Sequence, residues 1–485
     1  MSAIGSILTN QGALNALNSI SQTSNTNNNL EQQLSSGLSI NSPADNPAGY
    51  ITAQGFTSQL NGLTQAISNA NQGVSLLQTA QGALQQQIGV TQQLNSIAVQ
   101  AANGTQSASD RQSLQSLVTQ LNTQITNTAA QTQFNGVSLL DGTFSNVQFQ
   151  VGAYSGQTLS LSIGNTAANS IGINQSSASA TVYNTEKGVL SNIASAAATT
   201  GAFTAGTVKF TGNNGNTGSL TVAANSSAAG LATSINALSS KTGISAQAVN
   251  TTTLKAANAT PGSGFAFKIQ GSGSTTQTIN AATVSALAAQ INGQTGTTGI
   301  TATVSSGSGS ISLTQANGKN IKITAVTAGS LTASGQGTAT TLKTGAGTAS
   351  GIIQGQVEFQ SSAAFSLSGG SSIGLNGASK LTSLSQINVT TSSGADSAIN
   401  IVKFALQGLN SQGGVLGAAQ QRLTATIANL NTSSQNVTSA LGVVQDANIP
   451  QVSNQLTQAQ IQAQAGVAAL KSSTTLQQSY LSLLP

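Results

Sequence analysis

Acidic residues are the side chains of this chain that could do acid–base chemistry, and they are few. Asp45, Asp110, Asp141 and Asp446 lie far apart in the sequence, whereas general acid–base catalysis needs groups that reach one substrate together. His and Cys are absent, so an activated serine, a thiolate nucleophile and a His-Glu-x-x-His zinc site lack their essential residues. We therefore expect no enzyme, no cofactor and no metal site.

The composition is unusually neutral. Charged residues make up only 4% of the 485 residues, and Ser, Thr, Asn, Gln, Gly and Ala take their place, whereas about a quarter of an ordinary soluble domain is charged. A neutral surface lacks the electrostatic repulsion that keeps monomers apart, so this composition favours self-association. Long periodic apolar stretches argue against the alternative, a disordered low-complexity chain.

Charge and hydropathy also limit the partners. The formal net charge is +5, and most of the positive charge lies in residues 175–390. The lysines there are scattered and Arg is absent, so we expect no nucleic-acid binding. There is no run of 18 apolar residues, so we expect no membrane insertion. The N-terminal residues show no standard secretory signal, so a secreted form would need another route out of the cell.

The two ends of the chain have the same pattern. Apolar residues recur every three or four positions, which predicts a long amphipathic helix at each end. Each helix has one apolar stripe and few charges, so the two must pack against each other and then against other copies of the chain. The residues expected to pack in this terminal core are Ile4, Ile7, Leu14, Leu17, Leu30, Leu34, Val452, Leu456, Val467, Leu470, Leu481 and Leu484.

Two longer tracts inside these ends, residues 60–88 and 399–444, repeat the spacing and predict coiled-coil-like helices. A shorter helix follows the first of these tracts, and Ser107 or Ser109 is expected to cap its start. From Gln133 the period changes to two, and the Asn-Gly and Asp-Gly turns predict a small β-hairpin element. The residues expected to pack in the longer tracts are Leu60, Leu63, Ile67, Val74, Leu77, Leu84, Leu423 and Leu430.

A corner separates the first two helices. The stretch LSSGLSINSPADNPAGY, residues 34–50, contains Gly37 and Gly49, which permit unusual backbone, and Pro43 and Pro47, which restrict it. Its one acidic residue is Asp45. This composition predicts a sharp, well-defined turn of the chain.

The middle of the chain is different in kind. Strand-like alternations such as TVKFTG and FAFKIQG recur between Gly/Asn turns, and residues 231–249 match residues 287–304 at a spacing of 56. A short helix leading into a strand fits both copies. We therefore expect a duplicated α+β unit, although biased composition could also produce such a match.

Several of these stretches resemble the signatures of bacterial flagellins. They include LSSGLSINSPADNPAG at the corner, GLTQAISNANQGVSLLQTAQGAL, AVQAANGTQSASDRQSLQ, TQFNGVSLLDG, GAAQQRL and the final YLSLLP. The resemblance covers roughly residues 1–170 and 395–485. Hook-filament junction proteins share the corner, but TQFNGVSLLDG is similar specifically to flagellin.

The resemblance implies an α+β multidomain fold, with long terminal helices, a β-hairpin element and β-rich domains inserted in the middle. The expected domains are 1–44, the N-terminal inner-core helix and linker; 45–172, the first part of an outer-tube helical domain; 173–392, surface-exposed variable β-rich domains; 393–446, the second part of the outer-tube domain; and 447–485, the C-terminal inner-core helix.

The resemblance also implies a function. Flagellins are exported unfolded by a type III system and become ordered when they polymerise into the extracellular filament used for swimming. The implied partners are other copies of the chain, the filament cap, the hook-filament junction proteins and an export chaperone. A secreted surface adhesin and a hook-filament junction protein are the alternatives, because the Ser/Thr-rich middle suits carbohydrate contact or attachment.

Some residues depart from the family pattern. Flagellins usually carry an Arg in place of Gln33, a basic residue at Ser39 and a second acid at Asn46, so the ion pairs of the corner cannot form here. Adaptation to acid or to varying salt would explain this neutrality, as would drift within the lineage, because neutral hydrogen bonds neither titrate near pH 4 nor depend on salt as ion pairs do.

The vertebrate innate-immune receptor for flagellin recognises three anchor residues in the family, an Arg, a Glu and a Leu. The residues that match these anchors are Gln93, Leu117 and Ile97, in that order. Two of the three anchors are therefore missing, and we expect weak or no activation of that receptor.

Overall fold

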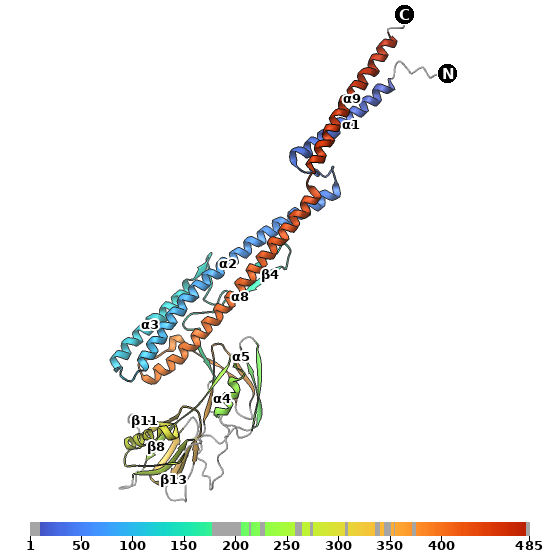
Figure 1. The fold of residues 1–485 in the computed structure, drawn as a ribbon. Helices are drawn as coiled ribbons and strands as arrows, with labels where there is room; N and C mark the ends of the chain where they lie inside the picture. Colours follow the sequence, from blue (N-terminus) through green and yellow to red (C-terminus); the bar gives the residue numbers. More distant parts are fainter. Residues whose placement is uncertain are drawn as a thin grey trace. The chain divides into compact units, whose positions relative to one another are not determined.

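The computed structural model describes residues 10–176, 205–212, 215–223, 228–257, 264–271, 275–305, 309–334, 340–343, 351–353, 355–370 and 375–481 (Figure 1). Long helices lie toward both ends and a β-rich region lies in the middle of the sequence, which confirms the predicted α+β fold class. The long helices are α1 (Gln11–Ser36), α2 (Pro47–Ala102), α3 (Ala108–Gln131), α8 (Ser392–Gln445) and α9 (Ile449–Leu481).

The chain divides into two compact units, which we describe separately. The first comprises residues 1–78, 146–162 and 417–485, and the second comprises residues 79–145 and 163–416. Helices α2 and α8 contribute to both units. The duplicated α+β unit belongs entirely to the second.

In the first unit, a hairpin packs on the helices. Strands β3 (Val147–Gln150) and β4 (Thr158–Leu161) pair antiparallel, as the period-two pattern predicts. Asn69 of α2 donates to the Gln150 carbonyl at 3.1 Å. The apolar cluster beneath the hairpin consists of buried Leu63, Ala66 and Leu430, with Ile67, Ala153 and Val437 packed against them.

In the second unit, polar side chains define the ends of the helices. Ser107 and Asp110 form a capping box at the start of α3, so the cap is Ser107 rather than Ser109. This bonding, led by the Ser107 hydroxyl, lowers the pKa of Asp110 below its ordinary value. Arg111 closes the end of α2 by donating to the carbonyls of Ala101 at 2.8 Å and Asn103 at 3.0 Å.

The chain leaves α3 through a tight turn. Asn135 and Gly136 adopt positive φ values of 50° and 77° between β1 (Gln133–Phe134) and β2 (Val137–Ser138). Two consecutive residues with positive φ give the turn that suits a two-residue hairpin. The predicted Asn-Gly turn is therefore confirmed.

The middle of the chain holds two copies of one module, a larger repeat than the sequence comparison detected. The first module consists of β6 (Gly206–Thr211), β7 (Thr217–Val222), α4 (Ala228–Asn236), α5 (Ser239–Thr242), the first half of β8 (Ser245–Ala257), β17 (Gln356–Ser361) and β18 (Ser366–Gly370). The second consists of β9 (Phe265–Gly271), β10 (Gln277–Ala281), α6 (Val284–Gly293), α7 (Thr295–Thr298), β11 (Ile300–Ser305), β12 (Ser310–Gln315) and β13 (Ile321–Ala328).

Sheet pairing supports this correspondence. The orders β7-β6-β18-β19 and β10-β9-β13-β16 match strand for strand, with β19 (Leu375–Ala378) and β16 (Gly351–Ile353) at corresponding edges. The pair β8–β17 of the first module matches β11–β12 of the second. The second module is therefore inserted between β8 and β17 of the first.

A third, larger sheet joins the two modules, because the second half of β8 pairs with β12 while its first half pairs with β17. The order of this sheet is β11-β12-β8-β17-β5-β20, where β5 is Gly172–Gln175 and β20 is Lys380–Ser383. Strands β14 (Ser330–Ser334) and β15 (Thr340–Lys343) extend it from β8.

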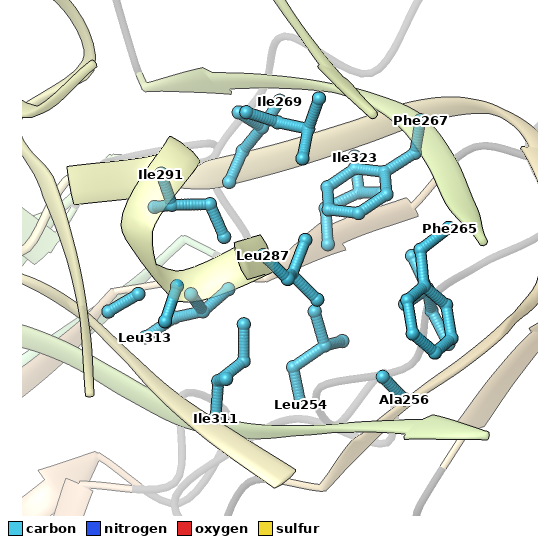
Figure 2. Packing of buried hydrophobic residues seen from close by; sticks show 14 of the residues in the cluster. Leu254, Ala256, Phe265, Phe267, Ile269, Leu287, Ile291, Ile311, Leu313 and Ile323 are labelled. Atoms are coloured by element: carbon cyan, nitrogen blue, oxygen red, sulfur yellow. The ribbon is translucent and has the colours of Figure 1, made fainter. Parts of the chain in front are cut away.

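Each module has its own apolar core. In the second module, Leu287 and Ile291 of α6 pack onto residues of both sheets, including Ile269 and Leu313 (Figure 2). In the first module, Leu231 and Ile235 of α4 occupy the corresponding positions among the residues of its core. The spacing of 56 residues relates these leucines and these isoleucines, so the repeated sequence is explained by equivalent packing.

An asparagine holds the helix to the strand in both modules. Asn292 donates to the Ala302 carbonyl at 2.7 Å and accepts from the Ala302 amide at 2.7 Å. Asn236 makes the same two bonds to Ala246, at 2.8 and 2.7 Å. The turns between are also alike, because Gly243 and Gly299 both adopt left-handed backbone, with φ of 70° and 69°. The same neutral side-chain amide therefore joins the helix to the strand in each module.

We expect Asn292→Ala to destabilise the second module by about 1–3 kcal/mol, because two backbone groups of β11 lose their partner. The measurement is hydrogen exchange of the β11 amides in the full chain. Asn280→Ala is the matched control, since the exposed Asn280 side chain lies in the same module outside this contact. Equal exchange rates in the two variants would show that the asparagine contributes nothing.

One acidic residue is half-buried in the larger sheet. Glu358 of β17 lies opposite Gln247 of β8 and on the face away from the core residues Val357 and Phe359. Burial raises the pKa of Glu358 above its ordinary value. The folded protein therefore holds this proton more tightly than the unfolded chain, and stability falls as the pH rises through the folded-state pKa.

Glu358→Gln should accordingly raise the melting temperature by a few degrees at pH 7 and leave it unchanged at pH 3. The melting temperatures at both pH values are measured by calorimetry of the full chain. Glu31→Gln, at an exposed position of α1, should change neither melting temperature. A lower melting temperature of Glu358→Gln at pH 7 would contradict the assignment of a burial cost.

Candidate functional site

The candidate functional site is the pair of terminal helices in the first unit, α1 and α9, with the corner that follows α1. Among the described residues there is no group of three or more His, Cys, Asp or Glu side chains that could hold a metal ion. No described helix is both long and apolar enough to cross a membrane.

Helices α1 and α9 run antiparallel and side by side (Figure 1). Asn10, which caps the start of α1, donates to the Ser473 carbonyl at 3.3 Å near the end of α9. At the other end, Leu30 is buried with Val452 and Ala459. The less exposed positions recur every three or four residues, and they are Ala13, Ala16, Ile20, Thr23, Asn27 and Leu30 on α1 and Val452, Leu456, Ala459, Ala463, Gly466, Leu470 and Ser473 on α9.

Several positions of this seam are small and let the helices approach closely. A Cβ added at Gly466 would lie 2.9 Å from Cγ1 of Ile20, closer than real Cβ atoms come to a neighbour. A Cβ added at Gly12 would lie 3.2 Å from the Ser473 hydroxyl. Ala and Gly side chains bury little apolar area, so the hydrophobic stabilisation of the seam comes mainly from its larger residues, such as Leu30 and Val452.

The seam also contains an unsatisfied polar group. The Asn27 carbonyl oxygen is buried and has no hydrogen-bond partner in the structure. Leaving such a group unpaired costs about 1–3 kcal/mol. A single buried Asn in a helix seam fixes the register of the pair at a cost in stability.

The predicted terminal-core residues fall into two groups. Leu30 and Val452 are buried, and Leu456 and Leu470 are half-buried in the seam. Leu14, Leu17, Leu34 and Val467 are instead 48%, 54%, 37% and 55% exposed. Ile4, Ile7 and Leu484 lie outside the described residues, and Leu481 ends α9 with its side chain outside them.

Sequence reasoning missed two exposed residues of α9 and Gly466 of the seam. Ile461 and Leu476 of α9 are 61% and 56% exposed. Gly466 follows Ala459 and Ala463 at heptad spacing, but a search for apolar side chains passes over a glycine. In α1, Ile20 and Leu30 lie in the seam while Leu14 and Leu17 are exposed, and the packing of the exposed residues against other copies stays a prediction.

The corner begins where α1 ends. Gly37 adopts left-handed backbone with φ of 73°, and its amide donates to the Gln33 carbonyl at 2.9 Å. The next residues pair with the connection between α8 and α9: the Ser39 amide donates to Gln445 at 2.6 Å, and the Ala447 amide donates to Gly37 at 2.9 Å. The corner is thus fixed by backbone bonds to the other end of the chain.

Asp45 organises the turn that follows. Its carboxylate accepts from the amides of Asn41 at 3.0 Å and Ser42 at 2.8 Å, and from the Ser42 hydroxyl at 3.1 Å. These bonds, led by the Ser42 amide, lower the pKa of Asp45 below its ordinary value. Pro43 lies exposed within the turn. The turn therefore keeps its charge-assisted bonds until the pH falls through this lowered pKa.

Helix α2 starts directly after the turn. Asn46 accepts from the Gly49 amide at 3.0 Å, and Pro47 is the first helical residue, where its missing amide costs nothing. Gly49 is helical, so the expected need for permissive backbone is wrong at this position. A Cβ there would lie 2.5 Å from Cδ1 of buried Ile40, so any larger residue requires the end of that side chain to shift.

The residues predicted to pack in the longer helices are all at least half-buried. Leu63, Leu77, Leu423 and Leu430 in the first unit and Leu84 in the second are buried, while Leu60, Ile67 and Val74 are half-buried. The positions equivalent to the innate-receptor anchors lie in the second unit. Gln93 and Leu117 are exposed and Ile97 is buried.

Family models match both ends of the chain. The bacterial flagellin N-terminal helical region matches residues 7–145, and the C-terminal helical region matches residues 399–484. A B-type flagellin of Pseudomonas aeruginosa is 32% identical over 98% of this chain and 99% of its own length. The chain belongs to the bacterial flagellin family. It is therefore a structural subunit of a flagellar filament and not an enzyme.

Other flagellar proteins are also similar to this chain. A flagellin of Xenorhabdus nematophila is 40% identical over 33% of this chain and 50% of its own length. Among solved structures, a flagellin of Burkholderia pseudomallei covers 72% of this chain and 99% of its own, at 20% identity and a TM-score of 0.30. The flagellar junction protein of Legionella pneumophila covers 82% and 100%, at 12% identity and a TM-score of 0.32. These scores are too low to support an argument from shape.

This flagellin replaces the ion pairs of the corner with neutral bonds. Gln33, at the position of the family's usual Arg, donates its side-chain amide to the Ser39 carbonyl at 3.2 Å. Ser39 in turn donates its hydroxyl to Gln445 at 3.1 Å. These two contacts are neutral and are not screened by salt, whereas the Asp45 carboxylate keeps its charge in the turn that follows.

We expect Gly466→Val to weaken the α1–α9 pair by about 1–3 kcal/mol, because the added side chain overpacks against Ile20. The measurement is the yield of filament from purified subunit added to filament seeds, which should fall sharply. Gly55→Ala is the matched control in α2, because a Cβ there meets nothing within 4 Å; it should assemble as well as the unaltered chain. Normal assembly of Gly466→Val would contradict a closely packed seam.

Proposed function

We propose that this flagellin assembles through the outward faces of α1 and α9, which become buried against other copies. The supporting observation is the exposure of large apolar side chains on the faces of α1 and α9 that lie away from their shared seam. Leu14, Leu17, Ile461, Val467 and Leu476 are 48% to 61% exposed in the single chain. Burying a Leu, Ile or Val side chain fully is worth about 1.5–3 kcal/mol, so several half-exposed residues per copy offer a substantial driving force.

Ordering of the ends is coupled to assembly in this proposal. Helices α1 and α9 contain 26 and 33 residues, and fixing each residue's backbone costs about 1–2 kcal/mol. The seam, in which the Asn27 side-chain oxygen is unpaired, offsets only part of that cost. The ends of the free subunit are accordingly disordered, which suits passage through a type III export channel as an unfolded chain.

The parts of the chain then take separate roles. Residues 1–44 and 447–485 form the inner core of the filament, residues 45–172 and 393–446 form the outer tube, and residues 173–392 face the surroundings. Residues Leu63, Leu77, Leu84, Leu423 and Leu430 are buried within the single chain and hold the subunit together rather than joining copies. Other copies, the junction proteins, the filament cap and an export chaperone are the partners that membership of the family suggests.

The alternative of a hook-filament junction protein is weaker. Identity to a B-type flagellin extends over 98% of the chain, including the middle. The departures at Gln93 and Leu117 concern recognition of the subunit by the innate-immune receptor and leave assembly unaffected, and weak or absent activation stays a prediction of this sequence.

Leu17→Asn tests the proposed assembly surface, because Leu17 is 54% exposed in the single chain. The substitution should leave the folded modules unchanged and reduce seeded polymerisation at least about tenfold, since about 1.4 kcal/mol of lost contact between copies is a factor of 10 in the binding constant. Val304→Asn is the matched control, with a 48% exposed side chain in β11.

Electron microscopy and sedimentation of the seeded product give the readout. Filaments of normal length and yield from Leu17→Asn, equal to those from Val304→Asn, would contradict the proposal. Loss of filaments in both variants would also contradict the proposal, because assembly would then not depend specifically on the outward faces of α1 and α9.

A further inference from the structure

The two modules share one exposed charged residue in addition to their cores. Strand β6 reads GTVKFT and β9 reads FAFKIQG, and in both the central residue is lysine, Lys209 or Lys268. The alternate residues face inward: Val208 and Phe210 are buried in the first core, and Phe267 and Ile269 are buried in the second (Figure 2). Because successive side chains of a strand point to opposite faces, both lysines lie on the outward face of their sheet.

Hydroxyl residues flank each lysine in register. Lys209 lies opposite Ser219 of β7 and Ser368 of β18. Lys268 lies opposite Thr278 of β10 and Thr324 of β13. Neighbouring strands are about 4.8 Å apart, so a group bound to the lysine ammonium lies within reach of a hydroxyl on either side.

A second lysine joins the face of the second module. Lys322 of β13 lies opposite Gln270 of β9, one step diagonally from Lys268. Its neighbours Ile321 and Ile323 are buried in the core, so Lys322 shares the outward face. Two positive charges at this spacing repel each other and are therefore stabilised by an anion that contacts both.

Protection of sheet edges does not explain these lysines. Exposed lysines often occur on edge strands, where they prevent pairing with other chains. Strands β6, β9 and β13 are interior strands of their sheets, with a neighbour on each side. The lysines lie on the flat face of their sheets instead.

The surroundings offer almost no compensating charge. Glu358 is the one acidic residue in the sequence between residues 205 and 390, and it lies in the larger sheet, on β17. Across the described part of this region, no ion pair is found for Lys209, Lys268 or Lys322. The positive charge on these faces is thus available to a partner.

We propose that the outward faces of β6 and β9, with Lys322, bind an acidic polysaccharide built of uronic acid units. Each unit offers a carboxylate to lysine and ring hydroxyls to the flanking Ser or Thr. A single lysine on an exposed surface binds such a group weakly, but a filament repeats the face in every subunit. Avidity along the polymer converts weak contacts into stable attachment.

This role goes beyond filament assembly, and the test separates the two. Filaments of the full chain are mixed with fluorescent alginate, a polymer of uronic acids, at about 20 mM salt, where surface charges are weakly screened, and are then sedimented. Unaltered filaments should carry alginate down and release it at about 500 mM salt. Neutral dextran should remain in solution.

The decisive variant combines Lys209→Gln, Lys268→Gln and Lys322→Gln. The matched control combines Lys241→Gln, Lys319→Gln and Lys380→Gln, which removes the same charge at exposed positions elsewhere in the region. The first set should reduce alginate binding at least about tenfold, and the control at most about twofold, because avidity multiplies the loss at each repeated contact. Arg at the three decisive positions should retain binding.

Several results would overturn the proposal. Equal loss in the two triple variants would show a response to net charge alone. Failure of unaltered filaments to bind alginate, or equal binding of dextran, would remove the uronic acid specificity. Filament yield is recorded for every variant. Alginate binding is normalised to the amount of sedimented protein, so a defect in assembly is not counted as a defect in binding. The single variant Lys268→Gln is measured beside the triple variants.

Discussion

A helix with apolar side chains on two faces cannot bury both against one partner helix. In this flagellin, α1 and α9 contact each other through Ala, Gly and a few larger residues, while Leu14, Leu17 and Val467 remain at least 48% exposed. In the proposed assembly, contacts with other copies supply the missing burial, and the order of the two ends becomes a property of the polymer rather than of the subunit.

Neutral hydrogen bonds replace charge elsewhere in the chain. At the corner, the Gln33 side chain donates to the Ser39 carbonyl. In the second unit, the Gln115 side chain holds the chain before α8: it donates to the Ile387 carbonyl at 3.1 Å and accepts from the Val389 amide at 2.7 Å. The asparagines of the two modules follow the same pattern. Amides neither titrate in the physiological range nor depend strongly on salt, so a chain with 4% charged residues can still fix its turns and junctions. The few charges that remain are then conspicuous, and the lysines of β6 and β9 are the clearest case.

Much of the fold could be predicted from the sequence, because periodicity reports directly on helices and strands. The long helices, the hairpin of β3 and β4 and the Asn-Gly turn follow from local pattern. The exposure of Leu14 and Leu17 beside the seam of α1 could not be predicted, since leucines three or four residues apart suggest one stripe whichever face meets the partner. Gly49 was misread for a similar reason: sequence shows a glycine, but only the structure shows the neighbouring Ile40 side chain, whose end a larger residue would have to shift. The contacts of Gln115 join residues more than 250 apart and leave no local signal.

Hydrogen exchange of the α1 and α9 amides, compared between free subunit and filament, tests the central claim most directly. If the ends are ordered only by contact with other copies, these amides should exchange within seconds in the free subunit and be protected by several orders of magnitude in the filament, while amides of β9 and β12 are protected in both. Strong protection of α1 and α9 in the free subunit would contradict the account, because it would show that the seam alone holds the ends.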